Sequence, residues 1–346
     1  MGVQVMSSPH FLVVLLAQIV IFWTKKTIMA DSRTPSDMST ALLISVDQSG
    51  HGDYKKIQDA IDAVPPNHKE LVYILVKPGI YKEKIVVPAD KPYITLSGTQ
   101  PSNTIITWHE GGSIFDSAVV TILASDFVAR YLTIQNTFGR SGKAVALRVS
   151  GDRAAFYNCR ILSYQDTLLD ETGRHFYSNC YIEGGTDFIC GDAASVFEKC
   201  HVHSTSEVGG IITAHHRSTP RENTGFTFLG CKITGSAGTT LLGRPWGAYS
   251  RVVFAFTSMS DAILPQGWDD WRDPSKQRTV YYGEYKCYGP GANRAKRVSW
   301  SRSLSTKEAL QFLNKNMIGG RGWLRPAPTH FKKFYTINSE KTKENN

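Results

Sequence analysis

The sequence contains no Asn-x-Ser/Thr sequon and no apolar run long enough for a comfortable passage through a bilayer. N-linked glycosylation is therefore not expected. The longest apolar run covers residues 11–23, 13 residues interrupted only by Gln18. A membrane-spanning helix needs about 20 such residues, so this run better suits the core of a signal peptide. No long helical period occurs between residues 71 and 256, which argues against long helices in that region.

Residues 1–30 are predicted to be a signal peptide cleaved after Ala30, and residues 31–41 a mobile leader. Two features depart from the usual pattern: the first ten residues carry no Lys or Arg, and Lys25 and Lys26 follow the apolar run instead of preceding it. A retained signal anchor is the alternative. Cleavage would make the protein secreted, into a compartment where disulfides are permitted.

Acidic residues are in the minority, with 39 Lys and Arg against 30 Asp and Glu, a formal charge of +9. Loss of Lys25 and Lys26 with the signal peptide leaves 37 basic residues against 30 acidic ones, so the mature chain stays at +7. A basic extracellular protein is expected to meet polyanions such as acidic polysaccharides. Hydrophobic content of 41% excludes a disordered chain, and a single folded domain is expected.

A short unit of the form aromatic-x-x-Cys-x-aliphatic recurs four times, with its cysteines 21, 20 and 31 residues apart. The copies are Phe156-Tyr-Asn-Cys159-Arg-Ile161, Tyr177-Ser-Asn-Cys180-Tyr-Ile182, Phe197-Glu-Lys-Cys200-His-Val202 and Phe228-Leu-Gly-Cys231-Lys-Ile233. This spacing is typical of one solenoid coil and predicts an all-β solenoid, a parallel β-helix. The four cysteines are then core thiols that behave as small hydrophobes. A bridge between neighbouring coils, for example Cys200 to Cys231, is the alternative.

Two aspartates occupy the same place in successive repeats. Asp166 lies seven residues after Cys159, and Asp187 lies seven residues after Cys180. Equivalent positions on adjacent coils stack at about 4.8 Å, so the two carboxylates are predicted to face each other. Two carboxylates this close do not both ionise easily, which separates a nucleophile from a general acid. The alternative is a pair of aspartates in solvent-facing turns, where water screens their repulsion.

Helices are expected only before and after the β-rich part of the chain. Apolar residues at helical spacing within residues 54–64, ended by Pro65 and Pro66, predict an amphipathic helix that caps the open N-terminal edge. Short β-rich runs follow at residues 71–76, 94–96, 119–123 and 252–256. The capping-box pattern of Ser305 and Glu308 predicts a C-terminal helix on the solenoid flank. Residues 331–346 are predicted to be a polar tail.

Four further strings resemble the plant pectin methylesterases (pectinesterases), esterases that act on cell-wall homogalacturonan. The strings are Gly79-Ile-Tyr-Lys-Glu83, Tyr164-Gln-Asp-Thr-Leu168, Asp187-Phe-Ile-Cys-Gly191 and Leu242-Gly-Arg-Pro-Trp246. Their order and gaps are similar to the family across residues 42–330. The resemblance implies a right-handed parallel β-helix and the release of methanol from pectin methyl esters. We expect a form without the inhibitor-like pro-region of many plant members, because few residues separate the signal peptide from these strings.

The resemblance also implies roles for individual residues. Asp187 matches the nucleophile that attacks the ester carbonyl, and Asp166 matches the acid that protonates departing methoxide and later acts as base. Gln165 matches an amide that stabilises the oxyanion. Arg244 matches the arginine that orients the nucleophile and contacts substrate, and a fixed guanidinium would keep Asp187 ionised. Trp246 matches an aromatic residue that packs against a sugar ring.

Two positions depart from the family pattern. Lys143 stands where the family carries a second oxyanion-stabilising glutamine, and Ile114 stands where it carries a substrate-contacting threonine. We still expect Lys143 to contact substrate. Trp268 and Trp271 are expected to flank the cleft as sugar platforms, although either could instead shield backbone. No cofactor and no metal are expected.

The expected partner is methyl-esterified homogalacturonan, with a proteinaceous pectinesterase inhibitor as a second candidate. No nucleic acid partner is expected, and the mature protein is predicted to be a monomer of the cell wall (apoplast) without a membrane attachment. Two rival functions stand beside this interpretation. Carboxylates about 5 Å apart also suit a retaining glycosidase, and a decayed esterase would bind pectin without catalysis. Methanol release separates the esterase from both.

Overall fold

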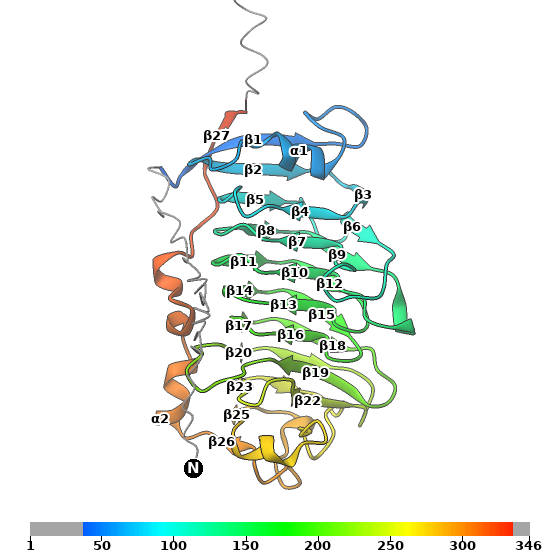
Figure 1. Ribbon diagram of the computed structural model, residues 1–346, viewed down its shortest axis with the longest axis vertical. Coiled ribbons are helices and arrows are strands. Elements are labelled where there is room, and N and C mark those ends of the chain that lie inside the picture. Colours follow the sequence, from blue (N-terminus) through cyan, green and yellow to red (C-terminus); the bar gives the residue numbers. More distant parts are fainter. Residues whose placement is uncertain (1–36, 335–346) are drawn as a thin grey trace, which may run out of the picture. The chain divides into compact units, whose positions relative to one another are not determined.

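The computed structural model describes residues 37–334, which fall within one compact unit. The predicted signal peptide, most of the leader and most of the polar tail lie outside the described residues. Three parallel sheets stack their strands along one axis, and the chain visits each sheet once per coil (Figure 1). The parallel β-helix predicted from the cysteine repeat is therefore confirmed.

Each of the three sheets orders its strands along the solenoid from the N-terminal end. Sheet A comprises β27 (His330–Lys333), β1 (Thr40–Val46), β2 (Leu71–Val76), β5 (Ile94–Ser97), β8 (Val128–Arg130), β11 (Ala154–Tyr157), β14 (Arg174–Ser178), β17 (Ala194–Glu198), β20 (Gly225–Leu229), β23 (Arg251–Ala255), β25 (Tyr281–Tyr285) and β26 (Arg302–Ser303). Sheet B comprises β3 (Gly79–Lys82), β6 (Thr104–Trp108), β9 (Thr133–Asn136), β12 (Arg160–Leu162), β15 (Tyr181–Gly184), β18 (His201–Ser204), β21 (Lys232–Thr234) and β24 (Ser258–Met259). Sheet C comprises β4 (Ile85–Val87), β7 (Val120–Ile122), β10 (Leu147–Val149), β13 (Leu168–Asp170), β16 (Ile189–Gly191), β19 (Gly210–His215) and β22 (Thr240–Pro245).

In the four cysteine units, the turn from sheet A to sheet B is made by one residue in the left-handed backbone region. That residue comes directly before the cysteine: Asn158, Asn179, Lys199 and Gly230, with φ between 51° and 62°. A single left-handed residue bends an extended chain sharply, which glycine and asparagine tolerate best. The residue before each cysteine thus forms the corner of the coil.

The aromatic residue of each unit packs inside the coil on its counterpart in the next. Ring centroids of Phe156 and Tyr177 lie 4.9 Å apart, those of Tyr177 and Phe197 4.6 Å, and those of Phe197 and Phe228 4.5 Å, all stacked. Offset-stacked rings add stabilisation beyond their buried area. The same stack continues to Phe254, which the cysteine pattern did not mark.

The four repeat cysteines are free and buried, so the prediction of core thiols is confirmed and the Cys200–Cys231 bridge is not formed. The thiols of Cys180, Cys200 and Cys231 each contact a backbone oxygen of the preceding coil. The Cys200 sulfur, for example, lies 3.4 Å from the Tyr177 carbonyl oxygen. Cys287 makes the same contact with Phe254. Cys287 is therefore a fifth cysteine at this position of the coil. Sequence reasoning missed it because the intervening coil carries Thr257 there instead of a cysteine.

The N-terminal capping helix is present as α1 (Ile57–Ala63). Its buried residues Ile57, Ala60 and Ile61 join the main core. The backbone N–H groups of Ile57 and Gln58 each donate to the Glu83 carboxylate at 3.1 Å. Because the first amides of a helix have no partner within it, Glu83 caps the helix. This gives one residue of the Gly79–Glu83 string a structural role.

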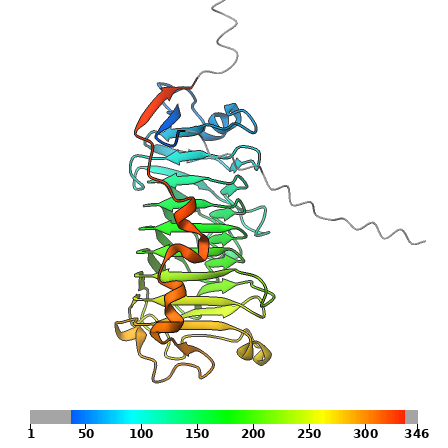
Figure 2. The same ribbon diagram turned by 90° about the vertical axis from the view of Figure 1, so that its left-hand side faces the viewer.

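The C-terminal segment lies along the flank of sheet A, as predicted (Figure 2). Ser305 and Glu308 form the predicted capping box at the start of α2 (Thr306–Ala309), which continues as a short 3-10 turn. Ala309 and Phe312 pack against Val253 of β23. Further on, β27 pairs with β1, so residues 331–333 of the expected polar tail and residues 40–41 of the expected leader belong to sheet A.

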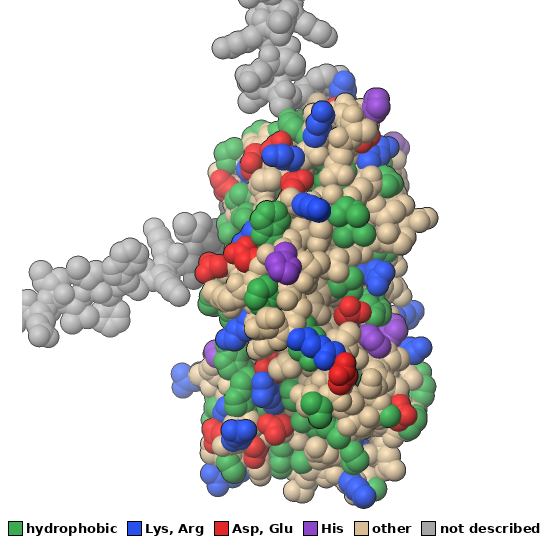
Figure 3. All heavy atoms as spheres, turned by 90° about the vertical axis from the view of Figure 1, so that its right-hand side faces the viewer, with side chains coloured by type: hydrophobic (Ala, Val, Ile, Leu, Met, Phe, Trp, Pro, Cys, Tyr) green, Lys and Arg blue, Asp and Glu red, His purple; other side chains and the backbone are tan. Residues whose placement is uncertain are grey.

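Basic and acidic side chains are interspersed over the face formed by sheet B (Figure 3). The net positive charge is therefore not gathered into one stripe on this side. Among residues 37–334, no helix is both long and apolar enough to cross a membrane.

Candidate active site

The two aspartates lie where the chain passes from sheet B to sheet C. Gln165 is paired in parallel with Thr186, and the Asp166 amide donates to the Thr186 carbonyl at 3.2 Å. Asp166 and Asp187 therefore occupy matching places on adjacent coils, as predicted. Both have left-handed backbones, with φ of 58° and 48°. Asn158 and Asn179 share this conformation at the corners between sheets A and B, so the two aspartates bend the chain in the same way between sheets B and C.

The two carboxyl groups differ in environment although both are buried. Burial, followed by the nearby charge of Asp187, raises the pKa of Asp166 to about 7. Its carboxyl group has no hydrogen-bond partner among the described residues. Burial also raises the pKa of Asp187, but hydrogen bonds and charge from Arg244 oppose that shift. Asp166 is thus placed to carry a proton near neutrality, whereas the contact with Arg244 favours the ionised form of Asp187.

Arg244, on β22, holds the Asp187 carboxylate with a two-pronged contact. Its Nε donates to Oδ1 at 2.8 Å, and its Nη2 donates to Oδ2 at 2.5 Å. Such bidentate pairs fix orientation as well as charge. Trp271 lies against the guanidinium, whose carbon is 3.8 Å from the ring centroid. The arginine is therefore held between a carboxylate and an indole.

The candidate oxyanion donors sit next to each other on successive coils. Lys143 is paired in parallel with Gln165, and both line one cleft with the two aspartates. Within the described residues, neither the Gln165 amide nor the Lys143 ammonium has a hydrogen-bonded or ion-paired partner. Both groups are consequently free to donate to a bound ligand.

Three tryptophans were predicted to touch sugar, and the structure brings two of them to the cleft. Trp246 is 37% exposed and packs edge-on against His216, with centroids 4.4 Å apart. Trp271 lines the same cleft, but its ring also supports Arg244. Sequence reasoning missed that second contact, which depends on the loop's course in space.

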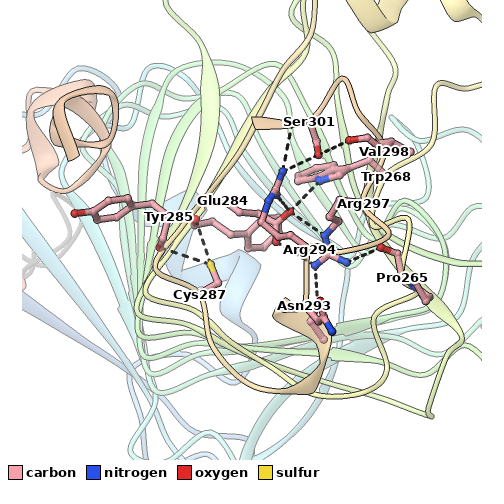
Figure 4. Close-up of polar contacts among 12 residues, drawn as sticks. Pro265, Trp268, Glu284, Tyr285, Cys287, Asn293, Arg294, Arg297, Val298 and Ser301 are labelled. Carbon is pink, nitrogen blue, oxygen red and sulfur yellow. Dashed lines mark hydrogen bonds and ion pairs between the residues drawn. The ribbon is translucent and has the colours of Figure 1, made fainter. Parts of the chain in front are cut away.

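The prediction for Trp268 is wrong. Its side chain is 1% exposed and stacks on Tyr282, with centroids 4.2 Å apart. Its indole N–H points to the Glu284 carboxylate at 3.5 Å, inside the C-terminal end of the solenoid (Figure 4). Trp268 is a core residue because the loop folds over that end and the large ring fills it.

The cleft has a volume of about 200 Å³. Beyond the predicted residues, Cys190 and Ala214 line it, and Ile114 stands at its wall. Cys190 lies outside the repeat unit, so its spacing carried no signal. Within residues 37–334, no group of three or more His, Cys, Asp or Glu side chains is arranged to hold a metal ion.

The fold and the cleft together define a class: a β-helical protein whose cleft presents two neighbouring carboxyl groups, one of them held by an arginine. Residues 43–321 match the family described as Pectinesterase. The chain belongs to the pectinesterase family and is an enzyme of that type. The match lies inside the predicted domain of residues 42–330.

Individual relatives agree with this assignment. The chain is 63% identical over 298 residues to a protein of Arabidopsis thaliana named "Putative pectinesterase 11", covering 86% of this chain and 84% of that one. A solved pectin methylesterase from carrot is 36% identical with a TM-score of 0.79, covering 84% and 96% of the two chains. A solved pectin methylesterase in complex with a hexasaccharide is 27% identical with a TM-score of 0.70, covering 83% and 98%. These matches confirm the right-handed parallel β-helix.

The acidity of Asp166 predicts how activity and stability change with pH. If Asp166 acts as the general acid, as the resemblance implies, it must be protonated, and kcat/KM should fall as pH rises through about 7. The unfolded chain releases this proton near pH ~4, so the folded state binds more protons between about pH 4 and 7 and loses stability as pH rises through that range. Melting temperatures of wild type and Asp166→Asn across this range check the second statement. An unchanged difference between them would contradict the assignment.

Proposed function

We propose that this protein hydrolyses methyl esters of homogalacturonan in the cell wall through an aspartyl acyl-enzyme. The observation that carries the proposal is the bidentate hold of Arg244 on Asp187, beside an Asp166 whose pKa is raised to about 7. A carboxylate held ionised can attack a carbonyl, and a neighbouring neutral acid can protonate the leaving group. In this proposal Asp187 is the nucleophile and Asp166 is the acid.

The reaction proceeds in two displacements. An Asp187 oxygen bonds to the ester carbonyl carbon, and the Gln165 amide donates to the developing oxyanion. The bond from carbon to methoxide then breaks, Asp166 gives its proton to the leaving oxygen, and methanol departs. Water adds to the acyl carbon while Asp166 takes one of its protons. Cleavage of the Asp187 acyl bond leaves a carboxylic acid on the sugar, which releases its proton to water and becomes the carboxylate, while Asp187 returns as a carboxylate and Asp166 is again protonated.

Several observations support a polysaccharide substrate. Trp246 and Trp271 place aromatic rings beside the carboxyl pair, and such rings offer apolar faces to sugars. A solved relative was obtained in complex with a hexasaccharide. The chain is basic, which favours an anionic polymer.

We propose secretion after cleavage of residues 1–30, a monomeric mature protein, and a proteinaceous inhibitor as a second partner.

Methanol release from highly methyl-esterified pectin by purified residues 31–346 tests the proposal. Steady release, with no new reducing ends, is expected. New reducing ends without methanol would instead indicate a glycosidase. Pectin binding without either product would favour the decayed esterase, the alternative that Lys143 raises.

Lys143 and Gln165 are expected to differ in importance. Lys143→Gln should keep activity within about tenfold, a barrier change of about 1.4 kcal/mol, because an amide at that position can still donate. Gln165→Ala should cost on the order of 10²-fold, since a preorganised donor next to the carboxyl pair is lost. Values of kcat for the two variants and wild type decide the comparison. An inert wild type that Lys143→Gln activates would overturn this account of Lys143.

A further inference from the structure

Arg297 lies at the C-terminal end of the solenoid, and its side chain is only 2% exposed. All five of its N–H donors have acceptors, of which Glu284 and Pro265 are labelled in Figure 4. Nε and Nη2 donate to the two oxygens of Glu284, each at 3.0 Å, and Nη2 also donates to the Gly291 carbonyl at 2.6 Å. Nη1 donates to the carbonyls of Leu264 and Pro265 at 3.3 and 3.0 Å. A guanidinium has no further donors, so its position is completely determined.

The loop that receives Arg297 is shaped to fit it. Gly267 has φ of +72°, and a Cβ atom there would lie 2.6 Å from Cδ of Arg297. No residue with a side chain could therefore occupy this place without displacing the arginine. Val298 adds a backbone hydrogen bond to the Gln266 carbonyl at 3.2 Å. Residues 264–267 are thus fixed to Arg297 from one side.

The other side of the same loop is joined to the strand that carries Arg244. The Leu242 amide donates to the Gly267 carbonyl at 2.7 Å, and the Asp269 amide donates to the Gly243 carbonyl at 3.2 Å. These bonds flank the residue directly before Arg244. A displacement of the loop would consequently move the backbone from which that guanidinium extends.

A second set of contacts joins the loop to Arg244 through the indole of Trp271. The Trp271 amide donates to the Asp269 carboxylate at 2.7 Å, which fixes the backbone of the residue that stacks on Arg244. Arg244 in turn donates hydrogen bonds to both carboxylate oxygens of Asp187. Two contact paths therefore connect Arg297 with the carboxylate, one along β22 and one through Trp271.

We propose that Arg297, together with Glu284, is a positioning residue for Asp187 and acts through the 264–271 loop and Arg244. The proposal rests on the proposed function in taking Asp187 as nucleophile. Arg297 does not line the cleft. Its effect is to hold the loop in the position in which Arg244 can donate to both carboxylate oxygens of Asp187.

Arg297→Lys is the informative change. A lysine ammonium has three donors on one nitrogen and cannot span Glu284 and the surrounding carbonyls at once. The loop should shift, and a misplacement of about 1 Å at a reacting group costs on the order of 10²-fold in rate. Burial and Asp269 raise the pKa of Asp187, whereas Arg244 and Lys143 lower it, and Asp166 faces it. A weaker hold by Arg244 should move the acid limb of the pH profile upward.

Arg294→Lys provides a matched control. Arg294 also binds the Glu284 carboxylate, but its other nitrogen donates to Ser301, at 3.2 Å to the hydroxyl, and not to the loop. We expect Arg297→Lys to lower kcat about 10-fold to 100-fold, with a smaller change in KM and an upward shift of the acid limb. Arg294→Lys should lower only the melting temperature. Combining Arg297→Lys with Arg244→Lys should cost less than the product of the two single losses.

The opposite result is equally clear. If Arg297→Lys lowers the melting temperature as Arg294→Lys does, but keeps the wild-type acid limb and kcat, Arg297 is structural only and the proposal falls. Carboxyl ¹³C NMR titration of Asp187 in the folded protein gives the same readout without turnover. An upward shift of that titration in Arg297→Lys supports positioning even if the wild type releases no methanol, whereas an unshifted titration overturns it.

Discussion

Asp187→Asn is expected to abolish methanol release while the solenoid stays folded. An amide of the same shape keeps the turn but cannot attack a carbonyl carbon. Loss of a covalent nucleophile typically costs at least about 10⁴-fold in kcat. The Arg244 fork would lose its anionic partner, yet Asn can still accept one of its two hydrogen bonds. Methanol release measured beside a melting curve separates lost chemistry from lost folding.

Asp192→Asn is the matched control for that experiment. Asp192 follows β16, and its Oδ1 accepts a hydrogen bond from the Thr224 hydroxyl at 2.7 Å, which an asparagine oxygen can also accept. It does not line the cleft. Wild-type activity in Asp192→Asn and none in Asp187→Asn would localise the effect. If Asp187→Asn kept more than a small fraction of wild-type turnover, Asp187 could not be the nucleophile.

Asp166→Asn should be the second most damaging change on methyl esters. Methoxide is a poor leaving group without a proton donor, and positioned acids contribute about 10² to 10⁴-fold. An aryl ester of galacturonate should rescue the first displacement, because a phenolate needs no proton to depart. A rapid burst of phenol from Asp166→Asn, followed by slow turnover, is the expected kinetic trace.

The same aryl ester distinguishes the two aspartates. Asp187→Asn should show no burst, because no acyl-enzyme forms whatever the leaving group. Equal rescue of both variants would mean that the roles of acid and nucleophile are assigned wrongly. Equal failure of both would indicate that Asp166 does more than donate a proton.

The repeat by itself determined the scaffold and the facing aspartates. In a solenoid each coil contacts only its neighbours. The gaps of 21 and 20 residues between Cys159, Cys180 and Cys200 therefore predict which residues stack. The register of Asp166 and Asp187 follows from the same counting. The capping box at Ser305 is equally local, since its hydrogen bonds join residues three apart.

Only the tertiary structure decided what the loops do. Trp268 and Trp271 stand three residues apart in a segment without a period, and nothing local indicates which one fills the core and which one reaches the cleft. The course of the loop across the end of the solenoid makes that choice, and Arg297 fixes the course from about 30 residues away in sequence. Contacts of this kind depend on side-chain packing between distant segments, and no repeat or motif records them.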